Sequence, residues 1–319
     1  LVKVNGATVA ASSFSGLLDT YTGAAAAYSV RQLRTGETIS MRIRRDTAGG
    51  TGDDDEADVA FDTSLSTPTI SLDSAISNAS GGVTATTFGE FVKASGYSNP
   101  DSLSGTILAY VDEWHDQSGN GNDAAQTTHG SQPQIYNGSA VITENGKPAV
   151  QFDGGYDGLT MSSLTYGNGL TLISLYNQAG TRGRIWCDDN TGQQGYWILF
   201  GNQTTYVGDS QKIYINDGAG FDNWTHQTAP KDQQNLLNIF FSSSQIVDSL
   251  NGTAQTQSVT GFSPPINLSG SSAGFAIGNS GNLTYHTEMK GQEFILYHSD
   301  QSSNRSGIET DINNYYSIY

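Results

Sequence analysis

The sequence is poor in cysteine and in basic residues. Cys187 is the one cysteine among 319 residues, which excludes an intramolecular disulfide, and we interpret it as a buried, small hydrophobic side chain. The 14 Lys and Arg residues stand against 31 Asp and Glu, for a formal net charge of −17. Because contacts with phosphate groups need Lys and Arg, we expect no nucleic acid and no anionic membrane among the partners.

Long hydrophobic runs and metal-binding motifs are also missing. No stretch approaches the roughly 20 apolar residues that cross a bilayer, so we expect no membrane insertion. The first residue, Leu1, is not Met, and we expect a segment upstream of it. The five histidines have neither His-x-x-x-His nor Cys/His spacing, so the sequence predicts no zinc site.

What is present is typical of an all-β protein. The chain has 38 glycines and is rich in Ser, Thr and Asn. From about residue 105, short apolar runs alternate with Gly, Asn and Asp turns, which predicts a two-sheet sandwich. Asn251 and Gly252 predict a type I′ hairpin turn. The predicted strands are residues 107–111, 149–152, 170–176, 184–187, 196–200, 212–215, 236–241, 246–250, 275–277 and 293–297.

The N-terminal region separates its charges along the chain. Residues 27–34 and 38–45 alternate as strands do and predict an antiparallel hairpin that is rich in arginine. An acidic loop follows at once, so we expect arginine–carboxylate pairing. Its carboxylates Asp53, Asp55 and Asp58 also supply the oxygen ligands that Ca²⁺ prefers. The loop therefore has two interpretations, a Ca²⁺ site or a solvated acidic turn.

Two helices and one domain are expected. Thr87 and Glu90 form a capping-box pattern that predicts a helix over residues 87–95. A terminal helix is predicted from Asn304, where apolar residues keep helical spacing. We find no internal repeat and no linker, so residues 1–319 are predicted to form a single domain. Within it, an irregular N-terminal part, 1–100, packs on the main sandwich and terminal helix, 105–319.

The polar turn at residues 114–123 has two interpretations. Trp114 and Asp116 have the side chains of a sugar site, in which an aromatic face stacks on a ring and a carboxylate accepts hydroxyl groups. Alternatively, Asp116, Asn120 and Asn122 bond backbone N–H groups of a tight turn.

Several segments resemble one fold family. The end of the chain resembles concanavalin A-like, laminin-G-type jelly rolls, and upstream segments resemble a subgroup that includes the catalytic domain of fungal-type α-L-arabinofuranosidase B and related modules of phage tail and virion proteins. The resemblance covers nearly the whole chain and implies a concanavalin A-like jelly-roll β-sandwich with a few short helices. The segments that carry it are residues 27–34, 42–45, 114–122, 144–154, 274–279, 290–297 and 314–316.

The catalytic carboxyls implied by the resemblance do not carry over directly. A retaining glycosidase needs two carboxyls ~5 Å apart. Where the family has its nucleophilic Glu after a Cys-Cys segment, the nearest match is Asp189, and where it has its acid Asp, this chain has Asn279. An amide cannot donate a carboxylic proton. The remaining combinations are Asp189 with Glu288, or Asp116 with Asp153.

Three functions follow from this reading. The first is a structural or adhesive protein of a phage virion, exposed to the medium, homo-oligomeric, and displaying a lectin-like surface to a host glycan or to other virion proteins. The second is a glycoside hydrolase or depolymerase with rearranged carboxylates. The third is a purely architectural virion subunit. The predicted ligand-binding residues are Trp114, Asp116, Trp186, Asp189, Trp197 and Tyr285. No cofactor is predicted other than Ca²⁺, which is one of the two interpretations of the acidic loop.

Overall fold

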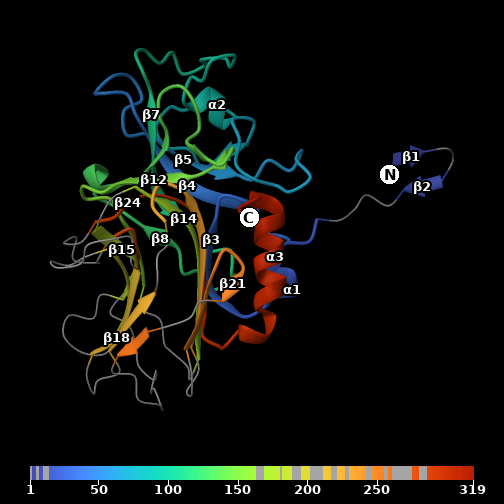
Figure 1. Cartoon of the computed structure of the whole chain (residues 1–319). Helices are drawn as coiled ribbons and strands as arrows, with labels where there is room; N and C mark the ends of the chain where they lie inside the picture. Colours follow the sequence, from blue (N-terminus) through green and yellow to red (C-terminus); the bar gives the residue numbers. More distant parts are fainter. Residues whose placement is uncertain are drawn as a thin grey trace.

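A two-layer β-sandwich carries a smaller lobe at one end in the computed structural model (Figure 1). The structure describes residues 2–4, 7–9, 14–162, 169–179, 182–188, 195–201, 211–216, 221–226, 230–241, 246–254, 258–260, 275–279 and 286–319. In the strands at 195–201, 211–216 and 221–226 the description covers the backbone alone.

All strand pairs of the first layer are antiparallel. Its order is β21 (Thr253–Ala254), β20 (Ile246–Leu250), β19 (Gln234–Phe241), β14 (Leu170–Gln178), β24 (Glu288–Tyr297) and β3 (Ala24–Ser29). The central strand β14 is buried along nearly its full length. Because the second layer covers one face and the terminal helix the other, both faces of β14 are buried, and its sequence does not alternate strictly between apolar and polar residues.

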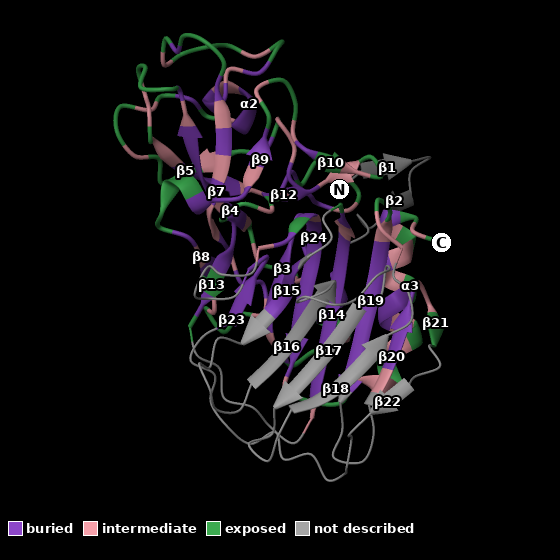
Figure 2. Cartoon of the chain, turned by 60° about the vertical axis from the view of Figure 1, so that its left-hand side comes forward, coloured by how far each residue is buried: buried purple, intermediate pink, exposed green. Residues whose placement is uncertain are grey.

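The strands of the second layer form an antiparallel sheet that extends from the lobe to the far end of the sandwich (Figure 2). Its order is β8 (Ala124–Ala125), β13 (Leu159–Met161), β23 (Phe275–Ile277), β15 (Arg182–Asp188), β16 (Gly195–Gly201), β17 (Gln211–Asn216), β18 (Phe221–His226) and β22 (Ser258–Thr260). These pairings confirm the predicted all-β sandwich.

The lobe connects the two layers. Its strands run in the order β6 (Ile76–Ser77), β5 (Glu56–Ala60), β4 (Ile39–Asp46), β7 (Leu108–Trp114), β9 (Gln134–Tyr136) and β12 (Val150–Asp153). Strand β12 then pairs with β24 of the first layer, and β7 pairs with β8 of the second. Two short pairs complete the set, β1 (Val2–Val4) with β2 (Ala7–Val9), and β10 (Thr143–Glu144) with β11 (Lys147–Pro148).

The helices are few and mostly short: α1 (Leu17–Thr20), α2 (Phe88–Phe91), α3 (Arg305–Tyr316), and the 3₁₀ turns η1 (His129–Ser131) and η2 (Ser302–Asn304). The predicted terminal helix is confirmed as α3, which packs along the outer face of the first layer (Figure 1). The predicted helix at 87–95 is shorter than expected, because Lys93 takes a φ of 51° and ends it. In the described part of the chain, no helix has the length and apolarity to cross a membrane.

The predicted hairpin between residues 27–34 and 38–45 is wrong. Strand β3 pairs with β24, and β4 pairs with β5 and β7. The reason is the buried side chain of Gln117, which donates to the carbonyls of Ser29 and Arg31, at 3.0 and 3.1 Å. It also accepts the N–H of Leu33 at 2.6 Å. This amide supplies the hydrogen bonds that a hairpin partner would have made.

The two layers meet at a cluster of perpendicular aromatic rings. Trp186 lies 5.6 Å from Phe294, and Trp114 lies 5.9 Å from the same ring, both edge to face. The indole N–H of Trp186 donates to Ser174 Oγ across the layers at 2.8 Å. Edge-to-face contacts of this kind add to the burial of apolar area. Both tryptophans are therefore central to the sandwich.

The predicted turn at Asn251 and Gly252 is confirmed, with φ values of 49° and 76° between β20 and β21. We expect Gly252→Ala to lower the free energy of unfolding by about 1 to 2 kcal/mol, because alanine disfavours positive φ. A Cβ at this position would also lie 2.8 Å from the Tyr319 ring. Chemical denaturation measures the effect, with Gly82→Ala, which meets nothing within 4 Å, as the control. Equal losses in the two variants would contradict the prediction.

Candidate functional site

The turn at residues 114–123 is structural. The Asp116 carboxylate, with the residue 6% exposed, accepts the N–H groups of Ala27, Ser118 and Asn122 at 2.8, 2.8 and 3.0 Å. It ties the turn to β3 and has no free lone pair directed to solvent. The proposed sugar contact at Asp116, and its catalytic pairing with Asp153, are therefore wrong. The alternative interpretation, in which Asp116 bonds backbone N–H groups, is confirmed.

The predicted ligand contacts of Trp114 and Trp186 are also corrected. Both side chains are fully buried in the aromatic cluster between the layers, so neither ring has a face open to a sugar. The remaining predicted binding residues, Asp189 and Tyr285, lie outside the described residues, as does the side chain of Trp197.

The acidic loop pairs with arginines as expected. Asp58 binds Arg42 at 2.7 Å and Asp55 binds Arg45 at 2.6 Å. Asp53 accepts the backbone N–H groups of Thr47 and Gly49. The three carboxylates of the predicted Ca²⁺ site therefore point to different partners and do not converge, which corrects that prediction in favour of a paired acidic turn.

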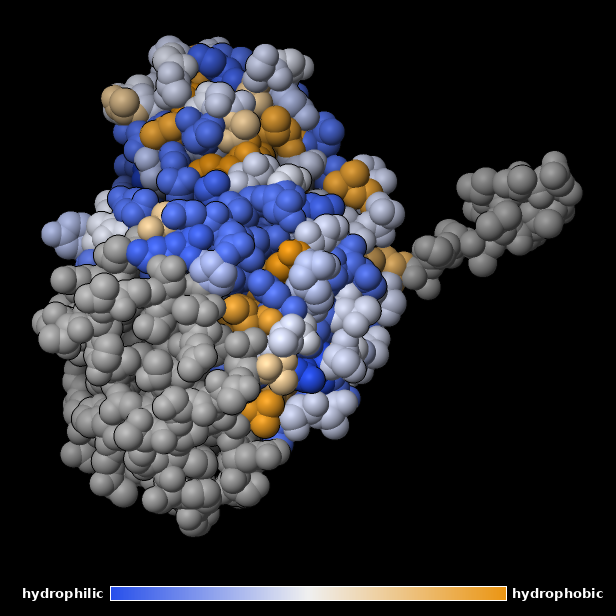
Figure 3. Space-filling view, viewed as in Figure 1, coloured by the Kyte–Doolittle hydropathy of each residue, from blue (hydrophilic) through white to orange (hydrophobic). Residues whose placement is uncertain are grey.

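An acidic cleft lies where the lobe meets the first layer. It consists of two adjoining hollows of about 380 and 390 Å³ that share Gln151 and Asp153 on β12. A hydrophilic band covers this level of the surface (Figure 3). The first hollow is lined by Glu144, Gln151, Phe152, Asp153, Asn177, Ala179, Asp232, Glu288, Met289 and Lys290. The second is lined by Arg44, Asp46, Asp54, Tyr110, His129, Gly130, Gln132, Gln134, Gln151, Asp153 and Asp157.

Three carboxyl groups meet in this cleft. Asp153 on β12 is the direct cross-strand partner of Glu288 on β24, so the two side chains share one face of the sheet. The chain then turns back through Gly154, and Asp157 Oδ2 accepts the Asp153 N–H at 2.8 Å. Glycine is required at 154, where φ is 76° and a Cβ would lie 2.9 Å from that of Glu288. The tight loop therefore brings Asp157 beside the strand pair.

The carboxyl group of Asp157 has a strongly raised pKa. Burial raises its pKa from the ordinary value of 3.8 to about 7, and the neighbouring Asp153 carboxylate raises it as well, whereas the hydrogen bond from the Asp153 N–H acts in the opposite direction. Near neutral pH, Asp157 is thus both a proton donor and an acceptor, and it lies beside a second carboxyl group, that of Asp153. Such a pair can donate to one ligand oxygen and accept from another hydroxyl.

Asn279 links this pair to the resemblance. Asn279 is the residue that the sequence resemblance matched to an acid, and it is fully buried. Its Nδ2 donates to the carbonyl of Asp157 at 3.3 Å. The side-chain amide of Asn279 therefore holds the backbone of Asp157.

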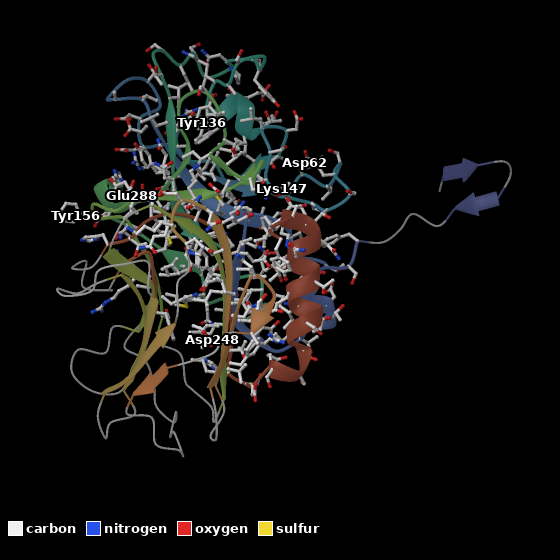
Figure 4. All side chains as sticks on the ribbon, viewed as in Figure 1. Asp62, Tyr136, Lys147, Tyr156, Asp248 and Glu288 are labelled. Carbon is white, nitrogen blue, oxygen red and sulfur yellow. The ribbon has the colours of Figure 1, made fainter. Side chains whose placement is uncertain are left out.

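The second hollow of the cleft is lined by a guanidinium group, several side-chain amides and a tyrosine ring. The Arg44 guanidinium lies 5.1 Å from the centre of the Tyr110 ring and donates to Gln132 Oε1 at 2.7 Å. In the loop between Asp153 and Asp157, Tyr156 is 64% exposed and packs edge to face on His286 at 5.2 Å. Figure 4 shows Tyr156 and Glu288 at the same edge of the molecule. An exposed ring beside fixed amides and carboxyls is the chemistry that binds sugars.

Sequence reasoning missed Asp157 and Tyr156 and placed Asp153 and Glu288 in different pairs. The sequence feature that could have revealed these residues is Asp153-Gly154-Gly155-Tyr156-Asp157, in which two glycines and a tyrosine stand between two aspartates at the end of a strand. Such a run marks a tight, exposed loop with functional side chains. Its pairing with Glu288, 135 positions after Asp153, is set by the β12–β24 register alone.

No family model matches the chain, and no curated protein matches it in sequence. Solved structures do match. A mutant GH54 α-L-arabinofuranosidase soaked with 4-nitrophenyl α-L-arabinofuranoside aligns with a TM-score of 0.58 and 15% identity, over 93% of this chain and 63% of that chain. An arabinofuranosidase complexed with arabinofuranosyl-α-1,2-xylobiose aligns with a TM-score of 0.57 and 14% identity, over 93% and 64%.

These comparisons confirm the jelly-roll-like β-sandwich. The chain spans less than two thirds of the length of these arabinofuranosidases, and at 14–15% identity the similarity establishes the fold and not the activity.

Proposed function

We propose that this chain is a carbohydrate-binding β-sandwich domain whose ligand site is the acidic cleft. The observation that carries the proposal is Asp157, whose pKa is raised, beside Asp153, in a loop that also carries the exposed Tyr156 and in a hollow lined by the amides of Gln132, Gln134 and Gln151. A sugar hydroxyl is both donor and acceptor, and the pair can serve both needs at neutral pH. The similarity in fold to sugar-processing enzymes supports the proposal.

The charge of the cleft selects the class of glycan. Carboxylates exceed basic groups among its lining residues, and the chain as a whole carries a formal charge of −17. Neutral sugars are therefore the expected ligands, whereas sialylated, sulfated or uronic glycans are repelled.

We further propose that the domain belongs to a phage virion protein, exposed to the medium and facing a host-surface glycan or other virion proteins. This part rests on the sequence resemblance of the segments that include residues 114–122 and 144–154. Exposed apolar side chains at Leu65, Tyr156 and Tyr319 support a homo-oligomer in which some of them become subunit contacts. Neither glycan binding nor turnover by the purified domain would favour the purely architectural subunit.

Tyr156→Ala is expected to weaken glycan binding about tenfold, because the exposed ring stacks on the apolar face of a sugar. The measurement is a screen on an array of neutral and anionic glycans, followed by calorimetry on the strongest neutral ligand. Tyr319→Ala is the control, since Tyr319 is similarly exposed, at 54%, but lies beside Gly252 at the β20–β21 turn and not in the loop that carries Asp153 and Asp157. Equal affinity of both variants and the native chain would remove the cleft as the binding site.

A second function is favoured by one observation, the raised pKa of Asp157. A glycoside hydrolase built on this cleft would use Asp157 as the proton donor and Glu288, across the strand pair from Asp153, as the second carboxyl. Release of 4-nitrophenol from 4-nitrophenyl glycosides, abolished in both Asp157→Asn and Glu288→Gln, would establish it. Binding without turnover would leave the lectin-like function.

A further inference from the structure

A second cluster of polar groups lies at the end of β7, outside the acidic cleft. Glu113 and His115 are two positions apart in extended chain, so their side chains point to the same side, while Trp114 between them points into the core. Strand β8 pairs with this end of β7, with Glu113 opposite Ala125 and Trp114 opposite Ala124. Asp123 directly precedes β8, as His115 directly follows β7, and the side chains of the two residues come close at this end of the strand pair.

The ligand atoms of this cluster converge. One oxygen of Glu113, one ring nitrogen of His115 and one oxygen of Asp123 lie within 4.8 Å of one another. His115 Nε2 is 3.4 Å from Glu113 Oε1, is buried, and has no hydrogen-bond partner. A buried ring nitrogen without a hydrogen bond is costly unless something else binds it.

The cluster is held in place by its surroundings. Asp123 Oδ1 accepts the N–H of Asp116 at 2.7 Å, which fixes the carboxylate and leaves its second oxygen for another partner. Outer contacts of this kind orient ligand groups in metal sites. All three residues are half-buried, so a cation can reach them from solvent.

The cluster also lacks the arginine that neutralises the neighbouring acidic turn. Within the described residues, no Lys or Arg forms an ion pair with Glu113 or Asp123. Arg42 lies directly opposite Glu113 on β4, but its guanidinium donates to Glu56 and Asp58 instead, at 3.0 and 2.7 Å. Two carboxylates are therefore left with one imidazole between them.

We propose that Glu113, His115 and Asp123 bind a divalent cation of the Zn²⁺ class. Two carboxylate oxygens and one imidazole nitrogen form a set that Zn²⁺ accepts in tetrahedral geometry with a fourth position for water, whereas Ca²⁺ prefers oxygens alone. The His-x-x-x-His and Cys/His spacings used in the sequence analysis missed this set, because it holds one histidine and two carboxylates, of which Asp123 lies at the far end of the polar turn. The cation would join β7 to β8 and stabilise the turn that holds β3.

Isothermal calorimetry and thermal denaturation of the metal-free protein with ZnCl₂ test the proposal. We expect Zn²⁺ to bind and to raise the midpoint of unfolding, and CaCl₂ at the same concentration to leave it unchanged. His115→Ala and Glu113→Gln are each expected to weaken Zn²⁺ affinity about 100-fold. His129→Ala is the control, since His129 pairs with one carboxylate, of Asp54 at 3.2 Å, outside this cluster.

A spectroscopic readout keeps the test independent of folding in the variants. Co²⁺ added to the native chain is expected to give the intense visible absorption of a four-coordinate site, and Zn²⁺ should displace it. Zn²⁺ affinity unchanged in both His115→Ala and Glu113→Gln would overturn the proposal, as would a native chain that binds neither metal. Glycan binding in the acidic cleft is measured separately and does not depend on the outcome.

Discussion

Arg31→Met is expected to lower the free energy of unfolding by about 4 kcal/mol, because it leaves a fully buried carboxylate without its cation. Arg31 Nε binds Glu293 Oε2 at 2.8 Å, and the two side chains are 5% and 0% exposed. A second nitrogen of the guanidinium reaches Glu293 Oε1 at 3.1 Å. The same group binds Asp311 on α3 at 2.8 Å, so it joins β3, β24 and the terminal helix. Urea denaturation at neutral pH measures the loss.

The matched control is Arg34→Met, three positions away. Arg34 pairs with Glu37 at 3.3 Å, but the side chains are 42% and 34% exposed, and solvent screens such pairs. We expect a loss below about 1 kcal/mol there. The double variant Arg31→Met with Glu293→Leu should recover most of the stability lost in Arg31→Met, because no charge is then left buried. Similar losses for Arg31→Met and Arg34→Met would refute the assignment.

Asp157→Asn is expected to stabilise the protein above neutral pH by on the order of 3 kcal/mol. Burial and the neighbouring Asp153 raise the pKa of the folded-state carboxyl to about 7, against an ordinary value of 3.8. The folded state then binds the proton more tightly than the unfolded chain. Stability contributed by this group is present in full below pH 3.8 and is lost as the pH rises toward 7. Asparagine stays neutral throughout and avoids that loss.

The measurement is urea denaturation of the native chain and Asp157→Asn at pH 4 and pH 8. Other carboxyls add their own pH dependence, among them Asp101, whose pKa is lowered by hydrogen bonds from Thr84 and Arg45 against the opposing effect of burial. The difference between variant and native chain cancels that background. We expect it to be small at pH 4 and large at pH 8. Asp300→Asn, at an exposed carboxylate, is the control, and a difference that does not change with pH would contradict the raised pKa.

Local features of the fold were predictable from the sequence. The turn at Asn251 and Gly252 forms as expected because two residues with positive φ suffice to specify it. The terminal helix α3 follows from the spacing of Ile308 and Ile312, which are both buried against the first layer. The pairing of the acidic turn with arginines was also predictable, since the opposite charges, 14 and 16 positions apart, lie on the consecutive strands β4 and β5.

Features that depend on distant partners were not predictable. The N-terminal strands alternate as a hairpin would, yet Gln117 bonds to the backbone of residues 29–33 and takes the partner's place. The same applies to Trp114. Its sequence context allowed a sugar contact at the surface, but the ring is buried in the aromatic cluster between the layers. A local sequence pattern does not specify which of several similar distant segments will pair with a given strand.

The sequence by itself determined the class of this protein: an acidic, all-β chain with one cysteine, short strands, one substantial terminal helix and a resemblance to a jelly-roll family. Composition and local periodicity act over a few residues, and these properties need nothing more. The tertiary structure decided where the chemistry lies. Asp153 and Glu288 meet through the β12–β24 register, because strand pairing joins residues that are remote along the chain, and the polar turn between β7 and β8 brings Asp123 back to His115.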